Sequence, residues 1–231
     1  MLQIKLPSAP GKDTSGKTFY FDDALETGKR YFVTGIGTDV GKTVASAILV
    51  ESLEADYWKP IQSGATADSD RLTVQSLISN TKSVFHAEVY SLREPLSPHA
   101  AAELDNIEIK LENIPLPYTH NTLIIEGAGG LMVPLNYNGL MVIDLINHCK
   151  AEAIVVSRNY LGSINHTLLS IEALKSRNIP IAGIIFNGAE NKATERVILE
   201  ETGVRMLGRI NEEPVVTKEV VLGYKTVFQT I

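Results

Sequence analysis

Residues 31–50 read YFVTGIGTDVGKTVASAILV, and they carry the strongest structural signal in the chain. A short β-rich run at residues 31–34 leads into the glycine-rich string GIGTDVGKT at residues 35–43, and an apolar helix start follows. A phosphate-binding loop needs this order, because the backbone N–H groups of the turn and the positive N-terminal end of the helix hold phosphate together. We therefore predict that Lys42 reaches the β- and γ-phosphates of a nucleotide and that Thr43 coordinates Mg²⁺.

A second string, GKDTSGKT at residues 11–18, matches the general pattern G-x-x-x-x-G-K-[ST] completely. Residues 35–43 match it less well, because Ile36 stands five positions before Gly41, where the pattern has glycine. The flanks nevertheless favour residues 35–43. The other string follows two prolines and leads into the aromatic, strand-like run FYF with no helix start. We predict that GKDTSGKT matches the pattern by chance.

Composition indicates one α/β domain over residues 29–231, preceded by an extension at residues 1–28. The net charge of −6 and the absence of a lysine- or arginine-rich block argue against nucleic acid or an anionic membrane as a partner. Cys149 is the single cysteine, so no intrachain disulfide can form, and we expect a part-buried thiol at a helix end. No apolar run reaches membrane-spanning length and no signal-peptide core is present, which favours a cytoplasmic protein.

After residue 30 the chain alternates between two kinds of periodicity. Strand-like runs lie at residues 31–34, 57–59, 87–90, 122–126, 153–157 and 181–187, and helix-like segments at 43–54, 70–79, 140–148, 164–177 and 192–201. Residues 105–121 contain two prolines and predict a short or irregular crossover. Several strand-like runs are almost continuously apolar, as in parallel strands that are buried on both faces. We expect a mostly parallel sheet with helices on both faces, a three-layer αβα fold.

Polar residues that close these runs are candidates for chemistry, because ligands gather at the carboxyl ends of parallel strands. Glu126 closes one run before a glycine-rich turn and is a candidate Mg²⁺ ligand, or alternatively an acidic cap on that turn. Lys59 closes another and could stabilise charge on a phosphoryl group or carboxylate, although lysines are common on surfaces. Asp70 begins a helix, where metal binding and helix-dipole stabilisation are equally good interpretations. Asn187 precedes a glycine and suits either a nucleotide base or a turn.

Seven strings resemble the dethiobiotin synthetase family in order and spacing: VTGIGTDVGKT, YWKPIQSG, SDRL, PLSPHAA, IIEGAGGLMVPL, GSINHTLLSIEAL and GIIFN. The resemblance covers roughly residues 30–210, and the family's phosphate loop has the same five-residue spacer as residues 35–43. It implies a P-loop NTPase-like fold and an ATP- and Mg²⁺-dependent ring closure. In that reaction CO₂ adds to 7,8-diaminononanoate to give a carbamate, ATP phosphorylates the carbamate, and the second amine closes the ring of dethiobiotin.

The resemblance also implies a role for individual residues and a homodimer whose active site borrows from the partner. Mg²⁺ would be held by Thr43, Asp70 and Glu126, and catalysis would depend on Lys42 and Lys59. ATP would be bound by Asp39, Val40, Gly41, Lys42, Thr43, Val44, Asp70, Glu126, Gly127, Ala128, Gly129, Asn187, Gly188, Asn211, Glu212 and Glu213. The substrate would be bound by Thr38, Ser63, Gly162, Ser163 and Asn165. Two positions depart from the family: Asp39 stands where glutamate is usual, and Asn211 where proline is usual.

Two other functions fit a phosphate loop. One is another P-loop ligase that activates a carboxylate with ATP, although no glutaminase-like domain with a catalytic cysteine follows. The other is an ATPase switch like ParA or MinD, but those proteins usually place a second lysine early in the loop, where this chain has Ile36 and Gly37.

Overall fold

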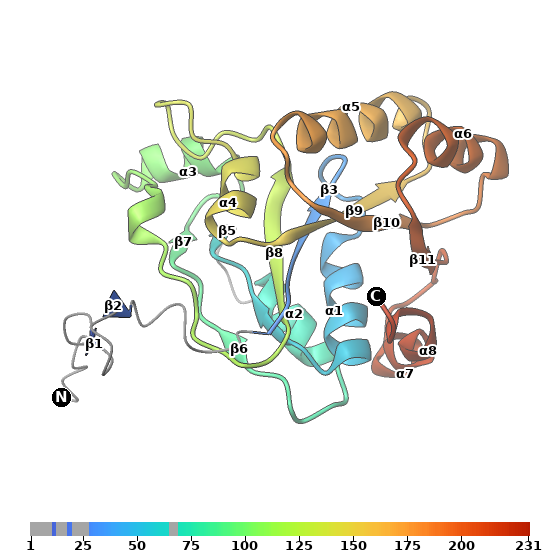
Figure 1. Ribbon diagram of the computed structural model, residues 1–231, viewed down its shortest axis with the longest axis horizontal. Helices are drawn as coiled ribbons and strands as arrows, with labels where there is room; N and C mark the ends of the chain where they lie inside the picture. The colour runs from blue at the N-terminus through green and yellow to red at the C-terminus, as the bar shows by residue number, and fades with distance from the viewer. Residues whose placement is uncertain (1–10, 13–17, 20–27, 65–68) are drawn as a thin grey trace.

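The computed structural model describes residues 11–12, 18–19, 28–64 and 69–231 (Figure 1). Two short strands, β1 (Gly11–Lys12) and β2 (Thr18–Phe19), pair antiparallel at the two ends of the string GKDTSGKT. Thr18 thus lies in a strand, in agreement with the predicted lack of a helix start. Residues 13–17 and most of the predicted 1–28 extension lie outside the described residues, so the chance match of this string stays a prediction.

A seven-stranded parallel sheet forms the centre of the fold, in the order β11-β10-β9-β3-β8-β4-β6. Its strands are β3 (Arg30–Gly35), β4 (Asp56–Trp58), β6 (Phe85–His86), β8 (Leu123–Gly130), β9 (Glu152–Arg158), β10 (Ile181–Asn187) and β11 (Met206–Ile210). β3 lies between β8 and β9. The chain passes from β3 to β4 and β6 on one side, returns to β8, and then continues through β9, β10 and β11 on the other side. The loop after β3 therefore lies at the point where the strand order reverses, which is where α/β sheets bind ligands.

Helices cover both faces of this sheet (Figure 1). One face packs against α1 (Lys42–Leu53), α2 (Asp70–Leu77), α7 (Lys218–Gly223) and α8 (Lys225–Phe228). The other packs against α3 (Pro98–Leu104), α4 (Val142–His148), α5 (Ser163–Ser176) and α6 (Lys192–Thr202). Strand alternation divides the core, since Phe32 joins one hydrophobic cluster and its neighbour Val33 the other. The predicted three-layer fold is confirmed.

The run at residues 87–90 was predicted as one strand, and that prediction is wrong. β6 ends at His86 in the large sheet, and β7 (Tyr90–Leu92) pairs with β5 (Ile61–Ser63) in a separate two-stranded parallel sheet. Pro60 causes the change of sheet: its carbonyl accepts hydrogen bonds from the N–H groups of Val89 (2.9 Å) and Tyr90 (3.0 Å). Because proline has no N–H, β4 cannot continue its ladder through residue 60.

The predicted irregular crossover at residues 105–121 is confirmed, since it contains only the short 3₁₀ helix η1 (Leu111–Asn113). The helix α3, the edge strand β11 and the helices α7 and α8 were not predicted. Cys149 follows α4 as expected but is fully buried rather than part-buried, and burial raises the pKa of its thiol to about 12. Within residues 28–64 and 69–231, the helices are all too short or too polar to cross a lipid bilayer.

Candidate active site

The loop after β3 forms a tight turn. Gly41 has φ of +93°, and a Cβ atom there would come within 2.1 Å of the Asn187 side-chain nitrogen, so this position requires glycine. The Lys42 ammonium donates a hydrogen bond to the Gly37 carbonyl at 3.1 Å, which places its charge over the loop. α1 begins at Lys42, so its first N–H groups lie at the end of this loop and have no acceptor within the helix. The geometry is that of an anion-binding turn at a helix N-terminus.

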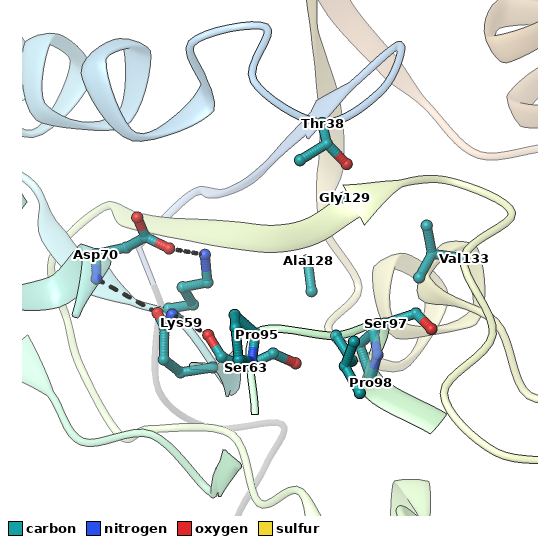
Figure 2. Close-up of a pocket in the computed structure, with 12 residues that line it drawn as sticks. Thr38, Lys59, Ser63, Asp70, Pro95, Ser97, Pro98, Ala128, Gly129 and Val133 are labelled. Carbon is teal, nitrogen blue, oxygen red and sulfur yellow. Dashed lines mark hydrogen bonds and ion pairs between the residues drawn. The ribbon is translucent and has the colours of Figure 1, made fainter. Parts of the chain in front are cut away.

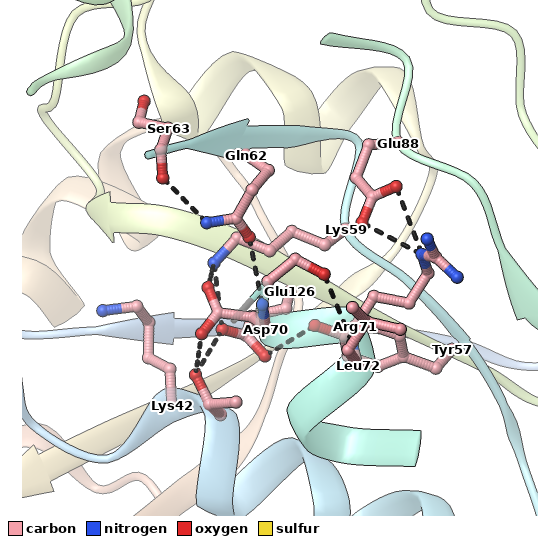
Figure 3. Close-up of polar contacts among 12 residues, drawn as sticks. Lys42, Tyr57, Lys59, Gln62, Ser63, Asp70, Arg71, Leu72, Glu88 and Glu126 are labelled. Carbon is pink, nitrogen blue, oxygen red and sulfur yellow. Dashed lines mark hydrogen bonds and ion pairs between the residues drawn. The ribbon is translucent and has the colours of Figure 1, made fainter. Parts of the chain in front are cut away.

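Beside the loop, four side chains from four segments form one polar cluster (Figure 3). The Thr43 hydroxyl oxygen lies 2.9 Å from Asp70 Oδ1 and 2.9 Å from Glu126 Oε1, and its single hydrogen can be donated to one of them at a time. The Lys59 ammonium donates to Glu126 Oε1 at 3.2 Å and also pairs with Asp70. Thr43 lies in the first turn of α1, Lys59 follows β4, Asp70 opens α2 and Glu126 lies in β8. The fold thus brings together the predicted metal and catalytic residues.

The cluster perturbs the acid–base properties of its members. Burial works to lower the pKa of Lys59, but the charges of Glu126 and Asp70 outweigh it and raise that pKa above the ordinary 10.5. Burial works to raise the pKa of Asp70, but the Lys59 charge and hydrogen bond and the Thr43 hydroxyl hold it below 3.8. Burial lowers the pKa of Lys42, and the Glu126 charge opposes this shift only in part. Lys59 and Asp70 are therefore held in their charged forms.

The donor set fits Mg²⁺. Two carboxylates each present a hard oxygen atom 2.9 Å from one hydroxyl oxygen, and Mg²⁺ prefers oxygen ligands. No group of three or more His, Cys, Asp or Glu side chains suited to a metal occurs in residues 28–64 and 69–231. A site with only two carboxylates suits an ion that keeps several waters and takes further oxygen ligands from substrate phosphates.

Three cavities adjoin one another along the carboxyl edge of the sheet. The central one, about 370 Å³, lies over the phosphate loop and is lined by the polar cluster. A second, about 340 Å³, shares Thr38, Lys59, Asp70 and Gly129 with it and is lined further by Gln62, Ser63, Pro95, Leu96, Ser97, Pro98, Ala128 and Val133 (Figure 2). A third, about 180 Å³, shares Asp39, Gly41 and Val44 with the central cavity.

The third cavity contains the residues expected around a nucleotide base. Asn187, Gly188, Asn211, Glu212 and Glu213 line it. The Asn211 N–H donates to the Tyr224 hydroxyl at 2.9 Å, and that hydroxyl donates to a Glu213 carboxylate oxygen at 2.5 Å. A proline at position 211 could not donate this bond. The departure from the family at Asn211 is therefore accompanied by a local hydrogen bond that holds the segment.

Some predicted site residues lie elsewhere. Gly162 directly precedes α5 with φ of +104°, Ser163 is buried and Asn165 is exposed. None of them lines the three cavities. Within one chain the structure does not join these three predicted substrate residues to the others. Two predicted ATP ligands also lie behind the cavities. Val40 is buried and its carbonyl accepts from Asn187 at 2.8 Å, whereas a Cβ at Gly127 would meet the Phe32 ring at 2.7 Å.

Other residues join the site without having been predicted. The Gln62 side chain accepts a hydrogen bond from the Asp70 N–H at 3.3 Å and donates to the Ser63 carbonyl at 2.8 Å, which ties α2 to the second cavity. Arg158 lines the third cavity and pairs with Glu212 at 2.8 Å. Arg158 is the last residue of β9, so it is one of the polar strand-end residues in which the sequence could have indicated a role at the site. The Tyr57 hydroxyl donates to Glu126 at 3.0 Å, and no sequence pattern indicated that contact.

The fold and the loop define a P-loop nucleotide-binding protein. A family model described as an AAA domain matches residues 29–220. A protein of Christiangramia forsetii named ATP-dependent dethiobiotin synthetase BioD is 55% identical over 201 residues, 87% of this chain and 96% of that protein. A protein of the same name from Cytophaga hutchinsonii is 51% identical, over 85% of this chain and 95% of that protein. The chain belongs to the ATP-dependent dethiobiotin synthetase family.

A solved plasmid partition protein from Borrelia burgdorferi has a similar fold, with a TM-score of 0.55 over 88% of this chain and 97% of that chain. Its sequence identity is 16%, so the likeness concerns the fold alone.

Proposed function

We propose that this chain catalyses the ATP-dependent closure of 7,8-diaminononanoate and CO₂ to dethiobiotin, with release of ADP and phosphate. The observation that carries the proposal is the junction of the cavities. A cavity of about 340 Å³ shares Lys59 and Asp70 with the cavity over the phosphate loop, so a small substrate there would meet the γ-phosphate. The membership of the chain in the dethiobiotin synthetase family supports the choice of substrate.

The proposed reaction has three steps. One amine of the substrate attacks the carbon of CO₂ and loses a proton, which gives a carbamate. A carbamate oxygen then attacks the γ-phosphorus of ATP, and the bond to the ADP oxygen breaks. Finally the second amine attacks the carbonyl carbon of this carbamic phosphate; phosphate leaves with the electron pair of the C–O bond, and the nitrogen loses a proton.

The side chains of the polar cluster suit these steps. Lys42 and the loop N–H groups would hold the triphosphate. Lys59 is held charged at the junction of the two cavities, where it would stabilise the carbamate and the transferring phosphoryl group. Mg²⁺ bound by Thr43, Asp70 and Glu126 would supply positive charge to the β- and γ-phosphate oxygens. Thr38 and Ser63 line the 340 Å³ cavity and would contact the diamine.

The remaining assignments concern the two ends of the site. Asn187 and residues 211–213 would surround adenine in the cavity of about 180 Å³. In a homodimer, Gly162, Ser163 and Asn165 of one subunit would bind the carboxylate of the substrate held in the cavity of the other subunit. This explains why they lie apart from the other site residues in one chain. Sedimentation analysis tests the dimer, and a monomer that forms product at full rate would refute the shared site.

The decisive assay follows dethiobiotin formation and ADP release from diaminononanoate, bicarbonate, ATP and Mg²⁺. We expect both to require the diamine. ADP release that is unchanged without the diamine would refute the synthetase and favour an ATPase switch or another ligase. Lys42→Ala should abolish turnover, whereas Lys17→Ala, in the string GKDTSGKT, should leave it nearly intact. The reverse result would refute the assignment of the phosphate loop.

A further inference from the structure

The Tyr57 hydroxyl contacts the polar cluster from inside the protein core. Tyr57 lies in the middle of β4, its side chain is fully buried, and it lines none of the three cavities of the site. We propose that Tyr57 is a positioning residue, whose hydrogen bond to Glu126 holds that carboxylate in the orientation that receives Mg²⁺. The inference rests on the proposed function, because it takes Glu126 to be a Mg²⁺ ligand.

The hydrogen bonds of Glu126 divide between its two oxygens (Figure 3). Oε2 accepts from the Tyr57 hydroxyl at 3.0 Å, whereas Oε1 lies 2.9 Å from the Thr43 hydroxyl and 3.2 Å from the Lys59 ammonium. A carboxylate can rotate about the bond to its side chain. With Oε2 tied to Tyr57 on the core side, Oε1 is the oxygen left to face Thr43 and the phosphate cavity.

The placement of Tyr57 follows from the sheet. Tyr57 lies within β4 and Lys59 directly follows it, and both side chains reach Glu126. β4 pairs with β8 in a register that aligns Tyr57 with Ile124, two residues before Glu126. The Tyr57 ring packs against Phe85 of β6, with ring centroids 5.8 Å apart. Two strands and a ring contact therefore fix the hydroxyl relative to the carboxylate.

Loss of the hydroxyl should weaken metal binding specifically. Oε2 would then be buried without that donor, and the carboxylate could turn away from Thr43 or pair more fully with Lys59. Groups that orient metal ligands typically contribute 10–100-fold to metal affinity. We expect Tyr57→Phe to raise the Mg²⁺ concentration at half-saturation about 10-fold. Binding of nucleotide without metal should stay near that of the unmodified chain, because Tyr57 lines none of the cavities.

Tyr31→Phe is the matched control. Tyr31 is buried in the same hydrophobic cluster, and its hydroxyl donates to the Ile231 carbonyl at 3.4 Å, away from the site. For all three proteins we would titrate Mg²⁺ at a fixed concentration of the non-hydrolysable analogue AMPPNP and record the rise in Tm. The KM for Mg²⁺ in dethiobiotin formation would be measured separately. Tyr57→Phe should shift both midpoints about 10-fold, and Tyr31→Phe neither.

The outcomes separate this inference from the proposed function. If Mg²⁺ does not raise the Tm of the unmodified chain with AMPPNP, the assumed metal site is wrong. If Mg²⁺ does raise that Tm, and the Mg²⁺ midpoint of Tyr57→Phe lies within about twofold of the unmodified chain's midpoint, Tyr57 does not position Glu126. An equal shift of the Mg²⁺ midpoint in Tyr31→Phe would also overturn the proposal. So would a metal-free melting curve showing that Tyr57→Phe does not fold, since the hydroxyl would then act on the whole fold.

Discussion

Replacing Lys59 with methionine should destabilise the protein strongly in the absence of metal. The Lys59 side chain is 7% exposed and its partner Glu126 0%, so the substitution leaves buried negative charge without its counter-ion. Removal of one member of a buried ion pair costs about 3–5 kcal/mol. The second partner, Asp70, is 29% exposed, and water can screen its charge in part, which favours the lower half of that range. For a chain of this size, about 2–4 °C of Tm per kcal/mol gives a loss of roughly 6–16 °C.

Thermal unfolding with and without Mg²⁺ measures the effect. The loss should shrink when Mg²⁺ and AMPPNP are added, because a divalent cation returns positive charge to Asp70 and Glu126. Lys82→Met is the control, since Lys82 is 70% exposed and its pair with Glu54 lies at the surface. If Lys59→Met lowers the metal-free Tm no more than Lys82→Met does, the buried ion pair does not have the role assigned to it.

Three further predictions follow from single positions. Gly41→Ala should weaken ATP binding at least about 10-fold in titration calorimetry, because φ is +93° and the new Cβ would meet Asn187. Gly139→Ala is the control: φ there is +88°, a Cβ would meet no atom within 4 Å, and ATP binding should stay unchanged. The depressed pKa of Asp70 stabilises the fold above the unfolded value of 3.8, and this contribution is lost as the pH falls from there through the folded pKa. Asp70→Asn should therefore flatten the decline of unfolding free energy in urea titrations on the acid side, and an unchanged slope would contradict the pairing with Lys59. Cys149, with a pKa raised to about 12, should react with a chromogenic disulfide only after denaturation; rapid labelling of the native protein would show that the site opens.

The centre of the sheet could be predicted from local pattern. The predicted strand at residues 181–187 coincides with β10, and burial of Ile184, Ile185 and Phe186 on alternate faces explains the continuous apolar run. The edges could not be predicted in this way. β11 carries Gly208 and Arg209 and is half exposed, so its composition lacks the apolar run of a central strand. The run at residues 87–90 lies instead between β6 and β7, and of its four residues only Tyr90 belongs to a strand, because the Pro60 carbonyl binds the N–H groups of Val89 and Tyr90.

The site shows the same division. Thr43 and Lys42 followed from one continuous string, because a strand, a glycine turn and a helix start are all local features. Asp70 was undecided between helix-dipole stabilisation and metal binding, and its contacts with Thr43 and Lys59 favour the second interpretation. Gln62, Tyr57 and Arg158 escaped prediction individually, although the strand-end rule applies to Arg158.

Local order along the chain was thus enough to predict a phosphate loop at residues 35–43, and its five-residue spacer indicated the family where the complete match at residues 11–18 did not. The meeting of Thr43, Lys59, Asp70 and Glu126 depends instead on the strand order, which sets β8 between β3 and β4. That order and its register are hydrogen-bonded pairings between segments far apart in the sequence, and residue periodicity does not specify which strands become neighbours. The contact between Tyr57 and Glu126 arises from the same pairing.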